Sequence, residues 1–443
     1  MRDLFLFFAL ALTLPLVIRT PIIGLLAWIW ITLMSPQREV YGFLRGFELN
    51  FYVAVLTAAA WLASKERKIV PLNPLSLSLI AFIVWASLST YMAIDRAYSA
   101  VIWDRTLKTI ILGLAVATLA DTRARIQAVL WALTISIGYY GAKGGGFVLL
   151  TGGRQHVYGP ENTMIADNNS LGLALIVLMP LVNYLRVTSR RQMTQWICLG
   201  LMGAGFLAII GTYSRGALLA MGAAAATYAV RSKSGIIVVI LGAGLVAAAP
   251  AVLPSGWLNR MSTIQSYNDD ESFAGRVAAW KTSFNIAKAH PLTGGGFSAV
   301  DLDSVARAFP SEGSLRRGRA AHSIYFEVLG DTGFVGLALY LSIYVAAWLN
   351  TLLILGAARG RPDLAWAGEL GRMLQVSLVA MMVGGGALSM AYYDGFIVIL
   401  ALTVAVLHVA RRPQAYAERS DQPQWRAIAQ EALPPEALAQ TAS

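Results

Sequence analysis

One histidine is the side chain of this sequence best placed to act as a base. His322 is one of only four histidines in the chain. It lies in the stretch AAHSIYFEVLGDTGFVGL, where a long polar region gives way to an apolar one, and the acidic Glu327 follows five positions later. A neutral imidazole at such a boundary could take a proton from an incoming hydroxyl group. A histidine that begins a helix and bonds to a backbone carbonyl is the plainer interpretation, and the residues alone leave both open.

Arginines in separate stretches are candidates for binding an anion. Arg276 opens the helix-like run AGRVAAWKTSFNIAKA, and Arg319 precedes the histidine in the basic stretch SLRRGRAAH. Arg215 begins an apolar run in the stretch TYSRG. Each could be an ordinary surface or headgroup-facing arginine. Together they describe a positive external surface at the membrane boundary, suited to a di-anionic phosphate group.

Two further cations are candidates by position. Lys143 lies in GAKGGG, inside an apolar run about 10 Å below its outer end at 1.5 Å per residue. Isolated cations within a membrane are costly and usually face a cavity or a partner. Arg154 follows in the next outer loop. We therefore add both residues to the candidate anion site.

Several kinds of chemistry lack their sequence signature. The chain has no G-x-x-x-x-G-K-[ST] stretch for nucleotide phosphates and no H-E-x-x-H stretch for a metal, and its histidines are scattered. Thr212 stands where a nucleophile elbow would have its first glycine, and the single Cys198 is flanked by apolar residues. We expect a reaction that uses no metal and no cofactor.

The composition is that of a membrane protein. Hydrophobic residues make up 57% of the 443 positions and charged residues only 13%, whereas soluble domains are nearer a quarter charged. Long apolar runs recur along the chain and predict an all-α polytopic protein with about twelve transmembrane helices. The expected spans are residues 4–18, 22–34, 51–63, 75–92, 107–120, 126–150, 165–185, 193–211, 216–230, 236–253, 331–356, 374–391 and 395–410. Because Pro21 cannot donate a backbone hydrogen bond, the first two could form one kinked element or a broken pair.

The distribution of positive charge predicts the orientation. Lys and Arg concentrate in alternate short loops, such as SKERK and RVTSRR, which we place in the cytoplasm. The net charge of +11 therefore reflects membrane topology and does not indicate nucleic acid. We expect four parts: transmembrane helices over 1–253, a periplasmic loop domain with short helices over 254–330, transmembrane helices over 331–410, and a cytoplasmic tail over 411–443.

The motifs together resemble one family. GTYSRGALLA, GRVAAW, HPLTGGGFSA and AHSIYFEVLGDTGFVGL, in this order and with this topology, are similar to the O-antigen ligase and polysaccharide polymerase superfamily. The N-terminal stretches SPQREVYGF and GPENTMIADNN resemble its subgroup of exosortase-associated putative O-glycosylation ligases. One position departs from the pattern, since Ser323 stands where many relatives have Asn after the histidine. This departure bears on the identity of the acceptor.

The resemblance implies a reaction and roles for the candidate residues. Arg215 and Arg276 would engage the pyrophosphate of an undecaprenyl-linked glycan donor, with Arg154, Lys143 and Arg319 as helpers. His322 would activate the hydroxyl of the acceptor, and direct attack would invert the anomeric configuration. The expected product is O-antigen on lipid A–core, made at the periplasmic face of the bacterial inner membrane.

Other functions stay open at this point. A protein O-oligosaccharyltransferase or a polysaccharide polymerase would use the same residues to bind the lipid-linked donor. A transporter of lipid-linked oligosaccharide is a more distant alternative, because transporters carry charged groups at mid-membrane and matching halves. In this chain the charges gather at one face, and no internal repeat is evident.

Overall fold

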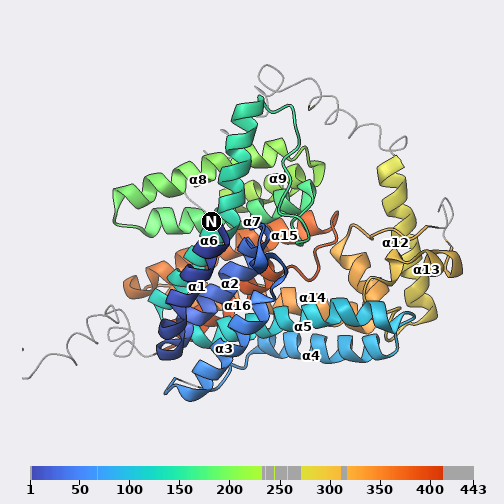
Figure 1. Ribbon diagram of the computed structural model, residues 1–443, viewed down its shortest axis with the longest axis horizontal. Coiled ribbons are helices and arrows are strands. Elements are labelled where there is room, and N and C mark those ends of the chain that lie inside the picture. Colours follow the sequence, from blue (N-terminus) through green and yellow to red (C-terminus); the bar gives the residue numbers. More distant parts are fainter. Residues whose placement is uncertain are drawn as a thin grey trace, which may run out of the picture.

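The computed structural model describes residues 2–66, 68–231, 271–310 and 317–412, together with the single residues 235, 244 and 257. All regular structure in these ranges is helical, as the sequence predicted (Figure 1). The α-helices are α1 (Arg2–Arg19), α2 (Pro21–Met34), α3 (Leu49–Ala63), α4 (Pro74–Tyr91), α5 (Arg96–Leu119), α6 (Arg123–Thr151), α7 (Asn168–Thr188), α8 (Gln192–Gly211), α9 (Arg215–Arg231), α12 (Glu271–Ala289), α13 (Asp303–Ala308), α14 (Ile324–Ala358), α15 (Ala365–Gly385) and α16 (Asp394–Ala410). Short 3-10 turns are η1 (Pro36–Arg38), η2 (Phe43–Gly46), η4 (Ala299–Asp301) and η5 (Pro362–Leu364).

Four of the described helices, α4, α7, α8 and α14, are long and apolar enough to cross a membrane by themselves. The helices α2, α3 and α16 are apolar but shorter. Large apolar side chains also face outward, among them Phe5 (79% exposed), Leu12 (74%) and Met193 (76%). An exposed apolar surface of this kind is suited to lipid. The membrane character is therefore supported, whereas the expected number of about twelve spans remains a prediction.

Each expected span within the described ranges coincides with a helix, although several boundaries differ. Helix α5 begins at Arg96, well before the apolar run, because Asp95 accepts a hydrogen bond from the Tyr98 N–H (3.0 Å) and caps it. Helix α14 likewise begins at Ile324 and α15 already ends at Gly385. The expected span 236–253 lies outside the described residues except for Gly244.

The first 34 residues form two helices. Thr20 between them is extended, with φ −141° and ψ 93°, and Pro21 begins α2. Proline lacks an N–H and suits the first position of a helix. The chain therefore breaks between Arg19 and Pro21, and of the two alternatives left open by the sequence it forms the broken pair.

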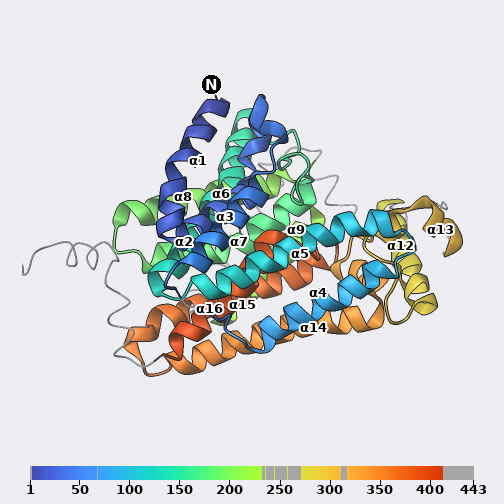
Figure 2. The same ribbon diagram turned by 60° about the horizontal axis from the view of Figure 1, so that its bottom comes forward.

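The helices α4, α5 and α14 lie side by side, and the helices α12 and α13 lie at one end of them (Figures 1 and 2). The helices α7, α15 and α16 are buried along most of their length and contribute much of the core. Helix α12 therefore lies at the end of this helix layer where α14 begins.

A glycine-rich loop after α12 fixes that end of the layer. The Gly295 N–H donates to Gly330 O (2.8 Å) and the Gly296 N–H donates to Asp331 O (2.9 Å). These bonds are possible because α14 is interrupted at Gly333, whose φ of 72° and ψ of −171° are not helical. This region of φ and ψ is open to glycine almost alone. The loop is thus inserted into a break in the long helix.

Polar side chains buried in the helix layer hold the same loop. Ser89 Oγ lies 2.6 Å from Thr293 O and 2.7 Å from Asp331 O. Ser99 Oγ accepts the Phe297 N–H at 2.8 Å. Asp331 Oδ1 accepts the Ser298 N–H at 2.8 Å, and its Oδ2 accepts the Tyr392 hydroxyl at 2.8 Å. Since buried backbone groups require partners, these side chains determine the position of the loop.

We expect Gly333→Ala to destabilise the fold. A Cβ at this position would lie 2.5 Å from Leu292 O, and alanine disfavours the φ of 72°. The backbone strain alone costs about 1–3 kcal/mol. The apparent melting temperature of the detergent-solubilised protein should fall clearly. Gly356→Ala is the matched control in the same helix, because a Cβ there meets nothing within 4 Å. Equal melting temperatures for the two variants would contradict the role of the kink.

Candidate active site

Helix α12 is fastened to the start of α14 by an aromatic side chain. Trp280 donates its indole Nε1–H to Ala321 O at 2.7 Å, and its ring stacks on Phe326 with centroids 5.2 Å apart. Arg276 precedes Trp280 by four positions and therefore projects from the same face of α12. His322 directly follows Ala321 in the chain. The contact thus brings the arginine and the histidine of two different motifs to one place.

His322 is held through its backbone, which leaves the imidazole available. Its φ of 47° is in the left-handed region, which histidine visits more readily than most residues. The His322 N–H donates to Ser389 Oγ at 2.8 Å, in the segment between α15 and α16. The residue as a whole is exposed. A substrate could therefore reach the ring.

The surroundings of His322 lower its pKa below the ordinary value of about 6.5. Partial desolvation by the surrounding protein is the largest cause, and the positive charge of Arg276 is the next. The carboxylate of Asp167, which lies just before α7, opposes them and raises the pKa. The imidazole is therefore neutral at pH 7 and able to accept a proton.

Arg319 lies against the first turns of α12. Its guanidinium passes over Gly275, where any Cβ would collide with Nη1. The Arg319 backbone N–H donates to Val300 O at 3.1 Å, which ties the basic stretch to η4. Arg319, three residues before His322, therefore lies against the turn of α12 that carries Arg276. Arg316 lies outside the described residues.

Arg215 is presented by a compact turn at the start of α9. Ser214 Oγ accepts the Ala217 N–H at 3.1 Å and caps the helix. Asn168 Nδ2 donates to Thr212 O at 2.6 Å, which ties the turn to the beginning of α7, next to Asp167. The Arg215 side chain itself is half-buried.

The turn that holds Arg215 also borders the segment that holds His322. A Cβ on Gly216 would contact the Ala387 Cβ at 3.6 Å, and Ser389, which binds the His322 backbone, is two residues further on. Helices α7, α9, α12, α14 and α15 thus meet at one region. The structure gathers Arg215, Arg276, Arg319 and His322 there.

Arg154 joins this region through the loop after α6. The Tyr213 hydroxyl donates to Gly153 O at 2.5 Å, and the rings of His156 and Tyr213 are 4.5 Å apart. Arg154 is the next residue and is exposed. It is therefore near the Arg215 turn, on the loop that continues toward Asp167.

Lys143 has a different partner. Its Nζ lies 3.2 Å from Glu39 Oε1, and its side chain is 58% exposed. The sequence indicated that a cation at this depth would face a cavity or a partner, and the carboxylate of Glu39 is that partner. We therefore associate Lys143 with the segment between α2 and α3.

Three residues of this region received no role from the sequence. Asp167 lies within the GPENTMIADNN stretch, and its one local signal is that its Oδ1 caps α7 by accepting the Asn169 and Ser170 N–H groups. Ser389 carries no motif. Glu327 Oε2 accepts the Ala391 N–H at 3.1 Å, and so it orders the segment that contains Ser389. In the described part of the chain, no three His, Cys, Asp or Glu residues are grouped so as to hold a metal ion.

Comparison with known families divides the chain into two parts. Residues 1–190 match a family of unknown function. Residues 197–341 match the family model described as O-antigen ligase. No curated protein matches the chain. The four motifs that carry the resemblance all fall within residues 197–341, as do Arg215, Arg276, Arg319 and His322. The segment that contains these four residues therefore matches the O-antigen ligase family, which supports a membrane enzyme that joins or polymerises glycans.

Proposed function

We propose that this protein transfers a glycan from an undecaprenyl pyrophosphate donor to a hydroxyl group, at the periplasmic face of the bacterial inner membrane. The observation that carries the proposal is the placement of Arg276 beside an accessible His322 of lowered pKa, in a region of the O-antigen ligase family. A base next to fixed cations suits a reaction in which a hydroxyl loses its proton while a pyrophosphate leaves.

In the proposed step, His322 removes the proton of the acceptor hydroxyl as its oxygen attacks the anomeric carbon. The new carbon–oxygen bond forms on the face opposite the pyrophosphate, so the configuration inverts. The electron pair of the broken glycosidic bond goes to the phosphate oxygen of undecaprenyl pyrophosphate. Guanidinium groups stabilise this growing charge and can bind phosphate oxygens in pairs.

The donor also adjusts the base. Arg276 lowers the pKa of His322 in the free protein. Bound pyrophosphate would neutralise much of that charge, and the imidazole would become a stronger base once the donor is present. We assign Arg276 and Arg319 to the pyrophosphate from the α12 side and Arg215 and Arg154 from the α9 side. Lys143 is left out of this set because Glu39 compensates its charge.

The proposed acceptor is lipid A–core, which would make the protein an O-antigen ligase. A protein hydroxyl or a second glycan would be activated by the same base and would use the same donor site. We would test the proposal by in vitro transfer with purified protein, undecaprenyl-pyrophosphate glycan and rough lipopolysaccharide. A ladder of glycosylated lipopolysaccharide supports the ligase; elongated lipid-linked glycan or a modified protein would identify another acceptor.

We expect His322→Gln to lower the rate of transfer by about 10²–10⁴-fold, because a general base contributes about that factor. Single-turnover rates with lipid-linked donor measure the effect. His290→Gln is the matched control, since His290 is exposed and its ring packs against Phe309. Comparable losses in both variants would exclude His322 as the base.

The pH profile should report the neighbours of His322. Protonated imidazole cannot act as a base, so kcat/KM for the donor, which reports the pKa values of the free protein, falls as the pH falls through the pKa of His322, below about 6.5. Arg276→Gln removes a charge that lowers this pKa, and the acid limb should move to higher pH. Asp167→Asn keeps a helix cap but removes a charge that raises the pKa, and the limb should move to lower pH. If the acid limbs of both variants moved in the same direction, His322 would not be the group that the profile reports.

Donor binding should depend on the arginines. We expect Arg276→Ala and Arg215→Ala to reduce kcat/KM for the donor by about 10- to 100-fold, the effect of one hydrogen bond to a charged group. Lysine should restore activity incompletely, because it cannot form a paired contact. The exposed Arg317 offers a control from the same basic stretch. An Arg317→Ala variant as impaired as Arg276→Ala would indicate diffuse attraction instead of a defined site.

A further inference from the structure

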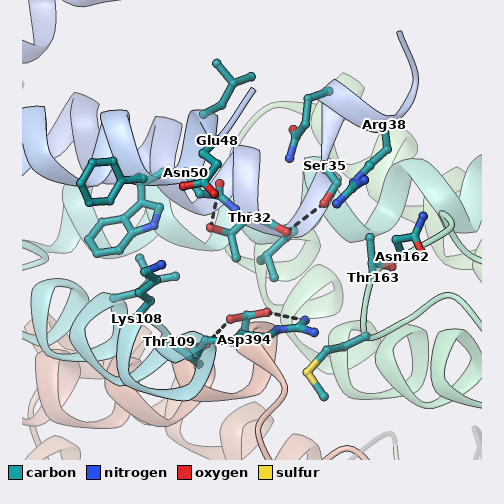
Figure 3. Close-up of a pocket in the computed structure, with 18 of the residues that line it drawn as sticks. Thr32, Ser35, Arg38, Glu48, Asn50, Lys108, Thr109, Asn162, Thr163 and Asp394 are labelled. Carbon is teal, nitrogen blue, oxygen red and sulfur yellow. Dashed lines mark hydrogen bonds and ion pairs between the residues drawn. The ribbon is translucent and has the colours of Figure 1, made fainter. Parts of the chain in front are cut away.

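A second region of the structure is hollow. A cavity of about 650 Å³ lies between the N-terminal part of the chain and α5 (Figure 3). This volume is within the roughly 300–1,000 Å³ of typical ligand cavities. Its walls come from four segments: residues 28–54, 101–112, 162–165 and 393–394. None of the candidate active-site residues lines it.

The cavity is nevertheless next to the candidate active site. Ile165 lines it and is two residues before Asp167, which acts on the pKa of His322. On the other side, Tyr393 lines it and is four residues after Ser389, which binds the His322 backbone. Two residues of extended chain span at most about 7 Å. Two short chain segments therefore connect the cavity to the candidate active site.

The charges around the cavity do not suit a second pyrophosphate. Its lining contains four cations, Arg38, Arg45, Arg105 and Lys108, and three carboxylates, Glu48, Asp104 and Asp394. Two of the cations are already paired: Lys108 Nζ lies 2.6 Å from Asp104 Oδ2 and Arg105 Nη2 lies 3.4 Å from Asp394 Oδ2. Carboxylates repel a polyanion, so the mixture favours a ligand that both donates and accepts hydrogen bonds.

Two buried polar atoms in the lining lack a partner. Gln37 is 9% exposed and Tyr393 is 4% exposed. Among the described residues, neither Gln37 Oε1 nor the Tyr393 hydroxyl has a hydrogen-bond partner. A buried polar group left unpaired is costly, and such groups are rare outside functional sites. Both residues line the cavity.

The remaining lining matches the surface of a sugar. Figure 3 shows Thr32, Glu48 and Asn50 on one side of the cavity, facing Lys108, Thr109 and Asp394 on the other. Aromatic side chains complete the wall: Trp28, Phe47 and Phe51. A sugar ring has apolar C–H faces and a rim of hydroxyls, each both donor and acceptor. Aromatic surfaces, amides and carboxylates are the complement of such a ligand.

We propose that this cavity is a saccharide subsite, which holds sugar residues of a substrate glycan beside His322. This rests on the proposed function, which supplies the glycan, and it extends that function by giving a role to the region of residues 1–190. The sugars belong either to the donor glycan or to the acceptor core. Both sources present the same chemistry, and direct binding can separate them.

The experiment measures binding and not transfer. Full-length protein in nanodiscs would be titrated with two probes and followed by saturation-transfer NMR. One probe is the oligosaccharide released by mild acid from the lipid-linked donor, and the other is the core oligosaccharide released from rough lipopolysaccharide. We expect one of them to bind and Gln37→Leu to weaken that binding by about tenfold, the loss of one or two hydrogen bonds.

Gln37→Leu also separates binding from folding. It replaces a buried amide whose oxygen has no partner among the described residues by an apolar group of similar size, so the melting temperature should be unchanged or higher. The exposed Gln192 at the start of α8 offers the control, and Gln192→Leu should bind as the wild type does. A probe that binds equally to both variants would overturn the subsite.

The outcomes distinguish the two proposals. If neither oligosaccharide binds while the wild type still transfers glycan in a His322-dependent manner, the saccharide subsite fails and the proposed function stands. If an oligosaccharide binds in a Gln37-dependent manner but no transfer occurs with any acceptor, the cavity stands and the transferase assignment fails. Retention of an anionic phospholipid in the cavity, displaced by neither probe, would also overturn the subsite.

Discussion

The break in α14 at Gly333 is the constraint on which the site depends. A regular helix would offer no free backbone groups to a neighbouring loop. The break instead lets Gly295 and Gly296 bond to the backbone of α14. Asp331, at the same break, binds the backbone of Ser298. Because α12 leads directly into this loop, the break determines where α12 ends and where Arg276 lies.

The chemistry at His322 is set by charges from elements that are distant in the sequence. Arg276 comes from α12 and Asp167 from the residue before α7, and they act on the imidazole in opposite directions. Both charges act on the imidazole electrostatically, and together with partial desolvation they leave it neutral at pH 7.

The two matched regions contribute different residues to the candidate active site and to the cavity. Residues 197–341 supply the arginines and the histidine, whereas residues 1–190 supply most of the cavity wall. They meet at the loop before α7, which lines the cavity at Ile165 and reaches the candidate active site at Asp167. Residues 389–394 after α15 connect the same two places. The proposed active site and the proposed saccharide subsite therefore draw mainly on different matched regions.

By itself the sequence determined the helical class, the positions of most helices and the residues of the candidate site, because apolar runs and motif arginines are local features. Even His322 was identified from its place at an apolar boundary. Only the tertiary structure decided which cations lie together: Arg276 and Arg319 share a surface, whereas Lys143 pairs with Glu39. The sequence pattern also did not predict the places of Asp167 and Ser389 or the cavity that Gln37 lines. Their roles arise from contacts between residues up to hundreds of positions apart, which follow from packing and not from periodicity.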